Sequence, residues 1–353
     1  MILTKINLPI AVCSLLLLST GILVISTSSL DLAIQQSTFA IIGIAAFLFM
    51  SLSDYRSIKS LITPLYIVVF LLLILVSFLG FETRGSVRWI PFGFFNIQPS
   101  EFAKPVLILT LASFWAKNYP SWKNIALSLI WTMPLALLIF RQPDLGSALT
   151  ILAIWLGMLF ASHVSFRKIM ILTLITILII PIGWLSLHEY QKQRVYSFLA
   201  PHSDPLGTGY NLIQSTIAVG SGQVVGRGLG RGTQSRLQFL PEFRTDFIFA
   251  SIAEELGFIG SVIILFLYLF MITYVLKLSE KAFDLFGFLI VFGVMSMLFF
   301  QTSVNIGMNV GLIPITGITL PLISYGGSSL VATLISLGMV ASVGRFKKRI
   351  DLD

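Results

Sequence analysis

The sequence predicts an all-α membrane protein, built as a polytopic bundle of about ten transmembrane helices. The first observation is composition: 56% of the 353 residues are hydrophobic and only 11% are charged. Soluble domains carry about 45–50% apolar and about 25% charged residues. The second observation is that apolar runs recur along the whole chain, and a bilayer needs roughly 20 such residues per helix.

Each apolar run is expected to form one helix, and together they make a single membrane domain covering residues 1–353. The first run follows a lone Lys5 and lacks the small-residue exit of a cleaved signal peptide, so it is expected to remain as a helix. An even number of spans would place both termini on one side of the membrane. The candidate spans fall at about 8–27, 37–53, 60–80, 101–117, 124–140, 146–163, 168–187, 246–276, 284–304 and 329–344.

The basic residues predict the orientation, because cytoplasmic loops carry an excess of lysine and arginine. The opposite short loops hold only Arg84, Arg88 and Arg141. Both termini are therefore expected in the cytoplasm, and the net charge of +8 mainly reflects topology. A nucleic-acid partner is not expected, since the sequence leaves no basic soluble surface. The basic residues on the side of the termini are Lys5, Arg56, Lys59, Lys117, Lys123, Arg167, Lys168, Lys277, Lys281, Arg345, Lys347, Lys348 and Arg349.

Two outer segments are longer than simple turns, at about 81–100 and 188–245. The second shows no helical periodicity, and long loops inside a compact domain are usually functional. The single cysteine, Cys13, excludes a disulfide within the chain. The histidines are scattered and do not suggest a zinc site.

The stretch "LPEFRTDFIFASIAEELGFIG" places several charges at the start of an apolar helix, where an unpaired charge is costly. One interpretation is that Thr245 or Asp246 caps the helix. The other is that Asp246 acts as a general base, or as a ligand for a divalent cation such as Mg²⁺ or Mn²⁺. The helix dipole would keep this carboxylate ionised, whereas an enclosed pocket would raise its pKa.

A helical wheel separates Asp246 from its acidic neighbours. Four small residues lie within about 40° of it, whereas Glu254 and Glu255 point elsewhere and are expected to pair within the bundle or at a partner interface. The stripe fits either tight helix packing or a groove for a lipid chain whose polar head reaches Asp246. The small residues are Ala250, Ala253, Gly257 and Gly260.

Three further motifs could carry chemistry on the outer side. Glu101 and Lys104 share a helix face, so they form either a simple ion pair or a phosphate-binding lysine with its positioning acid. The glycines and arginines of "VVGRGLGRGTQS" fit a flexible turn or an anion-binding nest. In "RQPDLGS", Asp144 is expected to cap the next helix. Trp89 suits an interfacial anchor or a sugar-stacking platform. Together these groups indicate an amphiphilic, phospholipid-like substrate.

Several long motifs resemble the SEDS family (shape, elongation, division, sporulation), and its RodA branch more than FtsW. The resemblance spans residues 88–330. It rests on "RWIPFGFFNIQPSEFAK", "RQPDLGSAL", "YQKQRV", "SDPLGTGYNLIQSTIAVGSG", "GRGLGRGTQSRLQFLPEFRTDFIFASIAEELG" and "GITLPLISYGGSSL".

The resemblance implies a ten-helix peptidoglycan glycosyltransferase that polymerises lipid II at the outer face of the bacterial cytoplasmic membrane. It also implies a class B penicillin-binding protein as partner. The family's essential aspartate matches Asp246, its glutamate–lysine pair matches Glu101 and Lys104, and its loop tryptophan matches Trp89. Within the matching motifs, the other expected substrate-binding residues are Arg88, Gln98, Arg141, Asp144, Gln234, Ser235, Arg244 and Thr245.

Two positions depart from the family pattern. The family usually has histidine before the Thr-Asp pair, and this chain has Arg244. Either a histidine base is dispensable, or its role passes to an arginine, which can act only as a cation. The family often has arginine where Asn96 stands, which removes one expected phosphate contact that Arg244 is expected to replace. Neither change affects Asp246.

The expected reaction is a direct, inverting transfer in which Asp246 accepts a proton from the acceptor sugar or holds a cation beside it. Two alternatives stay open at this point. A lipid II flippase would suit the same cations and groove, although a transporter should carry polar groups and broken helices at mid-membrane. A scaffold that only recruits the penicillin-binding protein would not need Asp246.

Overall fold

The computed structural model describes residues 7–79, 81–83, 86–92, 95–187, 189–237 and 239–346. Five of the basic residues used for the orientation, and one of the scattered histidines, lie outside the described residues. These are Lys5, Arg84, His188, Lys347, Lys348 and Arg349.

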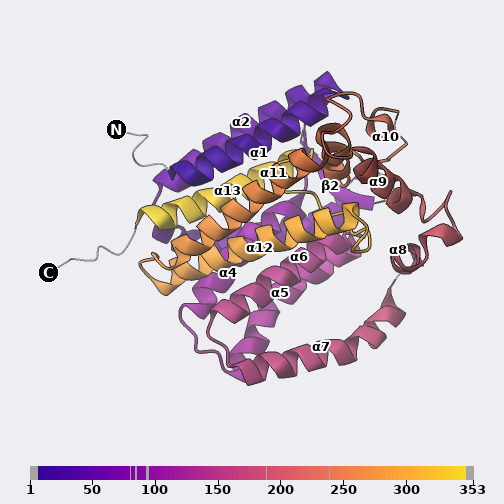
Figure 1. Cartoon of the computed structure of the whole chain (residues 1–353). Coiled ribbons are helices and arrows are strands. Elements are labelled where there is room, and N and C mark those ends of the chain that lie inside the picture. Colours follow the sequence, from indigo (N-terminus) through magenta and orange to yellow (C-terminus); the bar gives the residue numbers. More distant parts are fainter. Residues whose placement is uncertain are drawn as a thin grey trace.

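Helices dominate the described structure, and each of the ten predicted spans overlaps one (Figure 1). Among the described residues, eight helical stretches are long and apolar enough to cross a membrane, and α6 is a shorter apolar helix. The all-α polytopic fold is confirmed. The helices are α1 (Leu8–Ser26), α2 (Leu30–Leu52), α3 (Ile62–Leu79), α4 (Pro99–Trp115), α5 (Trp122–Arg141), α6 (Leu145–Ala161), α7 (Phe166–Ser186), α11 (Ile248–Ser279), α12 (Leu285–Asn309) and α13 (Gly327–Arg345).

The core lies between α4, α6, α11, α12 and α13, whose facing side chains are largely buried. α13 runs along α2 at close range, and a Cβ on Gly338 would lie only 2.8 Å from the Phe47 carbonyl oxygen. α7 lies at the edge of the bundle, and none of its described side chains is buried (Figure 1). α1 begins and α13 ends at the same end of the bundle, on the left in Figure 1. We call the opposite end, where α8–α10 and β2 gather, the outer end.

The predicted loop at 81–100 contains a small antiparallel sheet with the order β1-β2-β3. Its strands are β1 (Phe81–Thr83), β2 (Ser86–Phe92) and β3 (Phe95–Ile97). Phe81 pairs with Trp89, and Pro91 pairs with Asn96. The sheet therefore holds Arg88 and Trp89 on a defined strand at the outer end.

The segment 188–245 is not a loop without helices, so this expectation was wrong. It holds α8 (Glu189–Leu199), the 3₁₀ helix η3 (Pro201–Ser203), α9 (Tyr210–Ser221) and α10 (Thr233–Arg236). These helices are short, and the buried residues of α9 are Leu212, Ser215 and Ala218, which form a single row three residues apart. So narrow a stripe gives only a weak periodic signal.

α11 differs most from the predicted span, because Gly257 has φ 68° and ψ −164° and interrupts the helix. A continuous helix of 32 residues would be about 48 Å long, well beyond the roughly 30 Å hydrocarbon core. The part after Gly257 alone, residues 258–279, is about 33 Å long and fits a bilayer.

The glycine-rich loop at residues 223–228 bridges this break. Its hydrogen bonds satisfy the backbone N–H and C=O groups that the interrupted helix leaves without partners. The bonds run from Arg227 N to Glu254 O (3.0 Å), Gly228 N to Glu255 O (3.0 Å), Phe258 N to Gln223 O (2.8 Å) and Ile259 N to Val224 O (3.1 Å).

Candidate functional site

Asp246 lies in the turn before α11, whose N-cap is Phe247. Its backbone oxygen accepts hydrogen bonds from the side-chain amides of Asn305 and Asn309, each at 2.9 Å. The Asn309 Oδ1 accepts from Ala250 N at 2.9 Å and so caps the first turn of α11. The interpretation of Asp246 or Thr245 as the cap is therefore wrong. The Asp246 carboxylate is left available for chemistry.

The turn that carries Asp246 lies inside the outer end of the bundle. Ser324 Oγ donates to the Thr245 carbonyl at 2.6 Å, and Gln36 Nε2 donates to the Ser324 carbonyl at 3.0 Å. Gln36 lies six residues after the start of α2, or about 9 Å along its axis. These bonds hold the turn that bears Asp246 beside the first two turns of α2, at the outer end of the bundle.

Asp246 is half-buried, and its pKa is raised to about 6, first by burial and then by the nearby carboxylates of Glu242 and Asp144. The guanidinium groups of Arg194 and Arg88 oppose this shift. At neutral pH the carboxylate is deprotonated yet more basic than an ordinary aspartate. General bases work best when their pKa lies near the operating pH.

Arg194, on α8, is the cation that lowers the pKa of Asp246 most. Both flank Gly317, where a Cβ would lie 3.5 Å from Asp246 Oδ2 and 3.9 Å from Arg194 Nη1. Gly317 has φ 75° and no side chain, so the carboxylate and the guanidinium can approach the same point. α8 thus brings a positive charge to the carboxylate from outside the bundle.

Asp144 connects three elements of the site. It caps α6 by accepting from Ser147 N at 3.0 Å, which confirms its predicted capping role. Its other oxygen accepts from Gln98 Nε2 at 3.1 Å, at the start of α4. The Arg88 guanidinium lies 4.0 Å from Asp144 and donates to the Gln142 carbonyl at 2.8 Å. Arg141, by contrast, is exposed at the end of α5.

Glu101 and Lys104 form the predicted ion pair, with Lys104 Nζ 2.7 Å from Glu101 Oε1. Both side chains are buried on the first turns of α4. A buried pair of this kind is strongly coupled, because removing one partner leaves an uncompensated charge. Gln98, which bonds to Asp144, is the N-cap residue of α4, so the pair lies about one to two helical turns after it in the chain.

Gln234 and Ser235, at the start of α10, contact a buried carboxylate. Their backbone N–H groups donate to the buried carboxylate of Glu254 at 2.9 and 3.1 Å, and the Ser235 hydroxyl adds a third bond at 3.0 Å. Glu254 was expected to pair within the bundle or at a partner interface, and these bonds place its partners within the bundle, at the start of α10. These donors hold the fold, and the predicted use of Gln234 and Ser235 as substrate contacts stays a prediction.

The structure separates the other predicted site residues. Arg244 donates to Ser28 Oγ at 2.9 Å, so its side chain turns towards the α1–α2 connection. Thr245 Oγ1 lies 3.0 Å from Glu242 Oε2 and helps to hold the carboxylate that raises the pKa of Asp246. Trp89 is half-exposed on β2, next to Arg88. Its stacking role stays a prediction.

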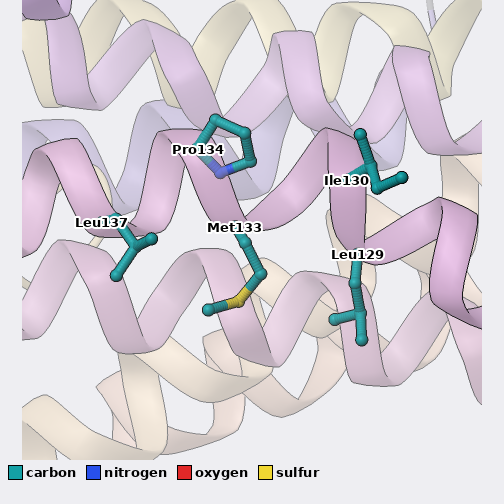
Figure 2. A pocket seen from close by; sticks show the side chains of 5 residues that line it. All are labelled: Leu129, Ile130, Met133, Pro134 and Leu137. Atoms are coloured by element: carbon teal, nitrogen blue, oxygen red, sulfur yellow. The ribbon is translucent and has the colours of Figure 1, made fainter.

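The predicted groove of small residues along α11 is not present as a continuous stripe. The break at Gly257 ends the wheel on which it was drawn, and Ala250 and Ala253 are buried. Tight packing therefore explains these residues. The hollow shown in Figure 2 lies elsewhere, on α5 around Pro134, and its lining is apolar, so it offers no group for polar chemistry.

Sequence reasoning missed Arg194, Asn305 and Asn309 as individual site residues. The two asparagines carried a usable signal, because they are four residues apart on one face of a mostly apolar helix. Polar side chains inside membrane helices normally have a partner or a function. Arg194 gave no such signal, since it lies in a short polar helix among similar residues.

Comparison with known proteins places this arrangement in a family. Residues 2–349 match the FtsW/RodA/SpoVE family, described as cell cycle protein. The chain belongs to this family. Among its relatives, the peptidoglycan glycosyltransferase MrdB of Escherichia coli K12 is 39% identical over 341 residues, covering 95% of this chain and 92% of the relative.

Solved structures agree with this assignment. A chain reported under "Structural coordination of polymerization and crosslinking by a peptidoglycan synthase complex" superposes with a TM-score of 0.85 at 31% identity, covering 97% of this chain and 99% of that one. The rod shape determining protein RodA of Thermus thermophilus gives 0.73 at 28% identity, covering 98% of each chain. The family, the fold and the enzyme class implied by the resemblance are confirmed.

Proposed function

We propose that this chain is a RodA-type peptidoglycan glycosyltransferase that polymerises lipid II into glycan strands during cell elongation. The observation that carries the proposal is the Asp246 carboxylate, with its raised pKa, beside Arg194 at the outer end of the bundle. A lipid-linked pyrophosphate presents its charges and sugars at that depth. The names of the relatives support the same reaction class.

In the proposed mechanism, Asp246 accepts the proton of the acceptor sugar's 4-hydroxyl. The oxygen then attacks the anomeric carbon of the donor sugar from the side opposite the leaving group, which inverts the configuration. Undecaprenyl pyrophosphate departs, and the positive charges of Arg88 and Arg194 stabilise the negative charge that develops on it. Lys104 and Arg141 remain candidates for the same role from α4 and α5.

The carboxylates near Asp246 suit a divalent cation only in part. Among the described residues, no group of three or more His, Cys, Asp or Glu side chains could hold a metal ion. Mg²⁺, however, is often held by one or two carboxylates together with substrate phosphates. Asp246 and Glu242 could provide those carboxylates, and a bound cation would then neutralise pyrophosphate charge.

We place the outer end of the bundle on the extracytoplasmic side, with both termini in the cytoplasm. Support comes from the excess of lysine and arginine at the end where α1 begins and α13 ends. The proposed partner is a class B penicillin-binding protein that crosslinks the product strand. The similarity to a chain from a peptidoglycan synthase complex supports an assembly of this kind.

The proposal is tested with the full-length chain, reconstituted with its transpeptidase partner and given labelled lipid II and Mg²⁺ or Mn²⁺. Within the time of the assay wild type should make long glycan strands, whereas Asp246→Asn, expected to be about 10²–10⁴-fold slower, should make no detectable polymer. Asp204→Asn is the matched control, because Asp204 is an exposed aspartate that holds only its own turn. Full-length polymer from Asp246→Asn would refute the catalytic role of Asp246.

A flippase remains the second candidate because α11 is a broken helix, a feature of many transporters. The break lies just before the 22-residue membrane span and is closed by the loop at 223–228. It is therefore not at the mid-membrane depth of a transport site, which favours the enzyme. Movement of lipid II across sealed vesicles without polymer would reverse this preference.

A further inference from the structure

The loop at residues 222–237 carries an exposed surface that the glycosyl transfer does not use. We call it the basic loop. Its exposed side chains are the apolar Val224, Val225, Leu229 and Leu237, the arginines Arg227, Arg231 and Arg236, and the neutral Gln223. Val225 is 76% exposed and Val224 is 60% exposed. Two adjacent valines so open to the surroundings indicate a surface that meets something apolar.

The depth of the basic loop follows from its hydrogen bonds to α11. Val224 O accepts from Ile259 N at 3.1 Å, and Gln223 O accepts from Phe258 N at 2.8 Å. Phe258 and Ile259 are the first residues of the 22-residue span that crosses the bilayer. Thr27, at the outer α1–α2 connection, bonds to Glu255 just before that span. Val224 and Val225 therefore lie at the outer edge of the hydrocarbon layer.

The apolar surface of the basic loop continues into the lipid-facing surface of α11. Phe258, Ile259, Val262 and Ile263 are all exposed on the helix directly after the break. In a chain that spans a membrane, this face of α11 is covered by acyl chains. Since the backbone bonds place Val224 beside Ile259, the same acyl chains reach the loop.

The charge of the basic loop is one-sided. Between Asp204 and Glu242 the sequence contains three arginines and no acidic residue. Arg236 lies within electrostatic range of Glu255, whereas the Arg227 guanidinium donates to neutral oxygens of Ser221 and Thr233. Arg227 also lines a hollow of about 380 Å³ together with residues 221–226. Arg227 and Arg231 thus supply positive charge next to the apolar valines.

We propose that the basic loop is a lipid-docking surface, which inserts Val224 and Val225 into the outer leaflet and binds the headgroup phosphates of anionic phospholipids through Arg227 and Arg231. Apolar side chains flanked by arginines are the composition of interfacial membrane-binding segments. Docking would fix the loop, which includes α10 and precedes the turn bearing Asp246 in the chain, at the headgroup level.

The first test measures the depth of Val225 in the full-length chain, reconstituted alone into phosphatidylcholine–phosphatidylglycerol vesicles. In a Cys13→Ala background, nitroxide labels are placed at Val225→Cys, at Ile263→Cys as the lipid reference and at Ser203→Cys as the exposed polar reference. The Val225 label should match Ile263 in its high accessibility to oxygen and low accessibility to a water-soluble nickel complex. A Val225 label as accessible to nickel as Ser203 would overturn the proposal and leave the surface to a protein partner.

The second test measures lipid preference with a fluorophore at Val225→Cys and vesicles in which only one lipid is brominated. Brominated phosphatidylglycerol should quench more strongly than brominated phosphatidylcholine, by up to about five-fold for each arginine. Arg227→Gln with Arg231→Gln should remove this preference, whereas Lys277→Gln with Lys281→Gln, at the other end of α11, should keep it. Equal quenching by both lipids in wild type, or a preference abolished by inorganic phosphate in the buffer, would overturn the anionic-lipid assignment.

Discussion

Two aspartates at opposite ends of the bundle precede helices in similar sequence settings but have different surroundings. Asp284 caps α12 by accepting from Gly287 N, and it also accepts from Tyr55 and Lys59. Burial alone would raise its pKa, but these hydrogen bonds outweigh burial and the pKa is lowered. At Asp246, burial first and then the neighbouring carboxylates raise the pKa to about 6. The number of hydrogen-bond donors around the carboxylate, rather than its position before a helix, separates a structural acid from a reactive one.

The two asparagines of α12 make this difference possible. Both donate to the backbone oxygen of Asp246, and Asn309 also accepts from Ala250 N in the first turn of α11, a task that a capping side chain would otherwise perform. Asp246 is therefore positioned through its backbone oxygen, and its carboxylate remains available for chemistry. At Asp284 the carboxylate itself accepts the structural hydrogen bonds, so it is not available for chemistry.

The largest expected effect is on catalysis at Asp246. Asp246→Asn should lower the rate of lipid II polymerisation by about 10²–10⁴-fold, the usual contribution of a general base. The melting temperature in detergent should not fall, because the folded state holds this carboxylate at a raised pKa and its charge disfavours folding above pH 6. If the activity of Asp246→Asn fell only in proportion to its folded fraction, Asp246 would have a structural role and not a catalytic one.

The buried pair Glu101–Lys104 offers a second contrast, since each charge is satisfied by the other. Lys104→Met leaves the Glu101 carboxylate buried alone and should cost about 3–5 kcal/mol of stability. Lys104→Met combined with Glu101→Gln should recover most of that loss, because no unpaired charge remains. Thermal unfolding of both variants in detergent gives the comparison. Equal destabilisation of the single and double variants would show that the pair is not coupled.

A smaller effect is expected at the structural acid. Asp284→Asn should cost about 0.5–2 kcal/mol, as for the loss of a helix cap, while the activity per folded molecule stays unchanged. Because the pKa of Asp284 is lowered, its contribution is present at neutral pH and is lost as the pH falls below its ordinary value of 3.8. The difference in unfolding free energy between wild type and Asp284→Asn should therefore disappear in acid. A difference that persists at low pH would contradict this account.

Much of this molecule follows from local sequence patterns, whereas the site depends on contacts between distant segments. Apolar length predicted the spans, and three-residue spacing predicted the Glu101–Lys104 pair. The helical wheel did not predict the break at Gly257. A loop about thirty residues earlier in the chain satisfies the backbone groups at the break through main-chain hydrogen bonds, and these leave no side-chain pattern in the sequence. Arg194 reaches Asp246 only because α8 folds back over the outer end, with Gly317 providing the space. No periodicity in one segment reports such an approach.

The smallest expected effect is the most specific test of the electrostatic account, because it concerns only the pKa of Asp246. The base must be deprotonated, so kcat/KM should rise with pH and level off above about pH 6. Glu242→Gln removes a negative neighbour that raises this pKa, so the rise should move to lower pH. Arg194→Gln removes a positive neighbour that lowers it, so the rise should move to higher pH. Measuring kcat/KM across pH for the two variants beside wild type gives shifts of opposite sign. Shifts of the same sign, or none, would mean that the charges around Asp246 do not set its basicity.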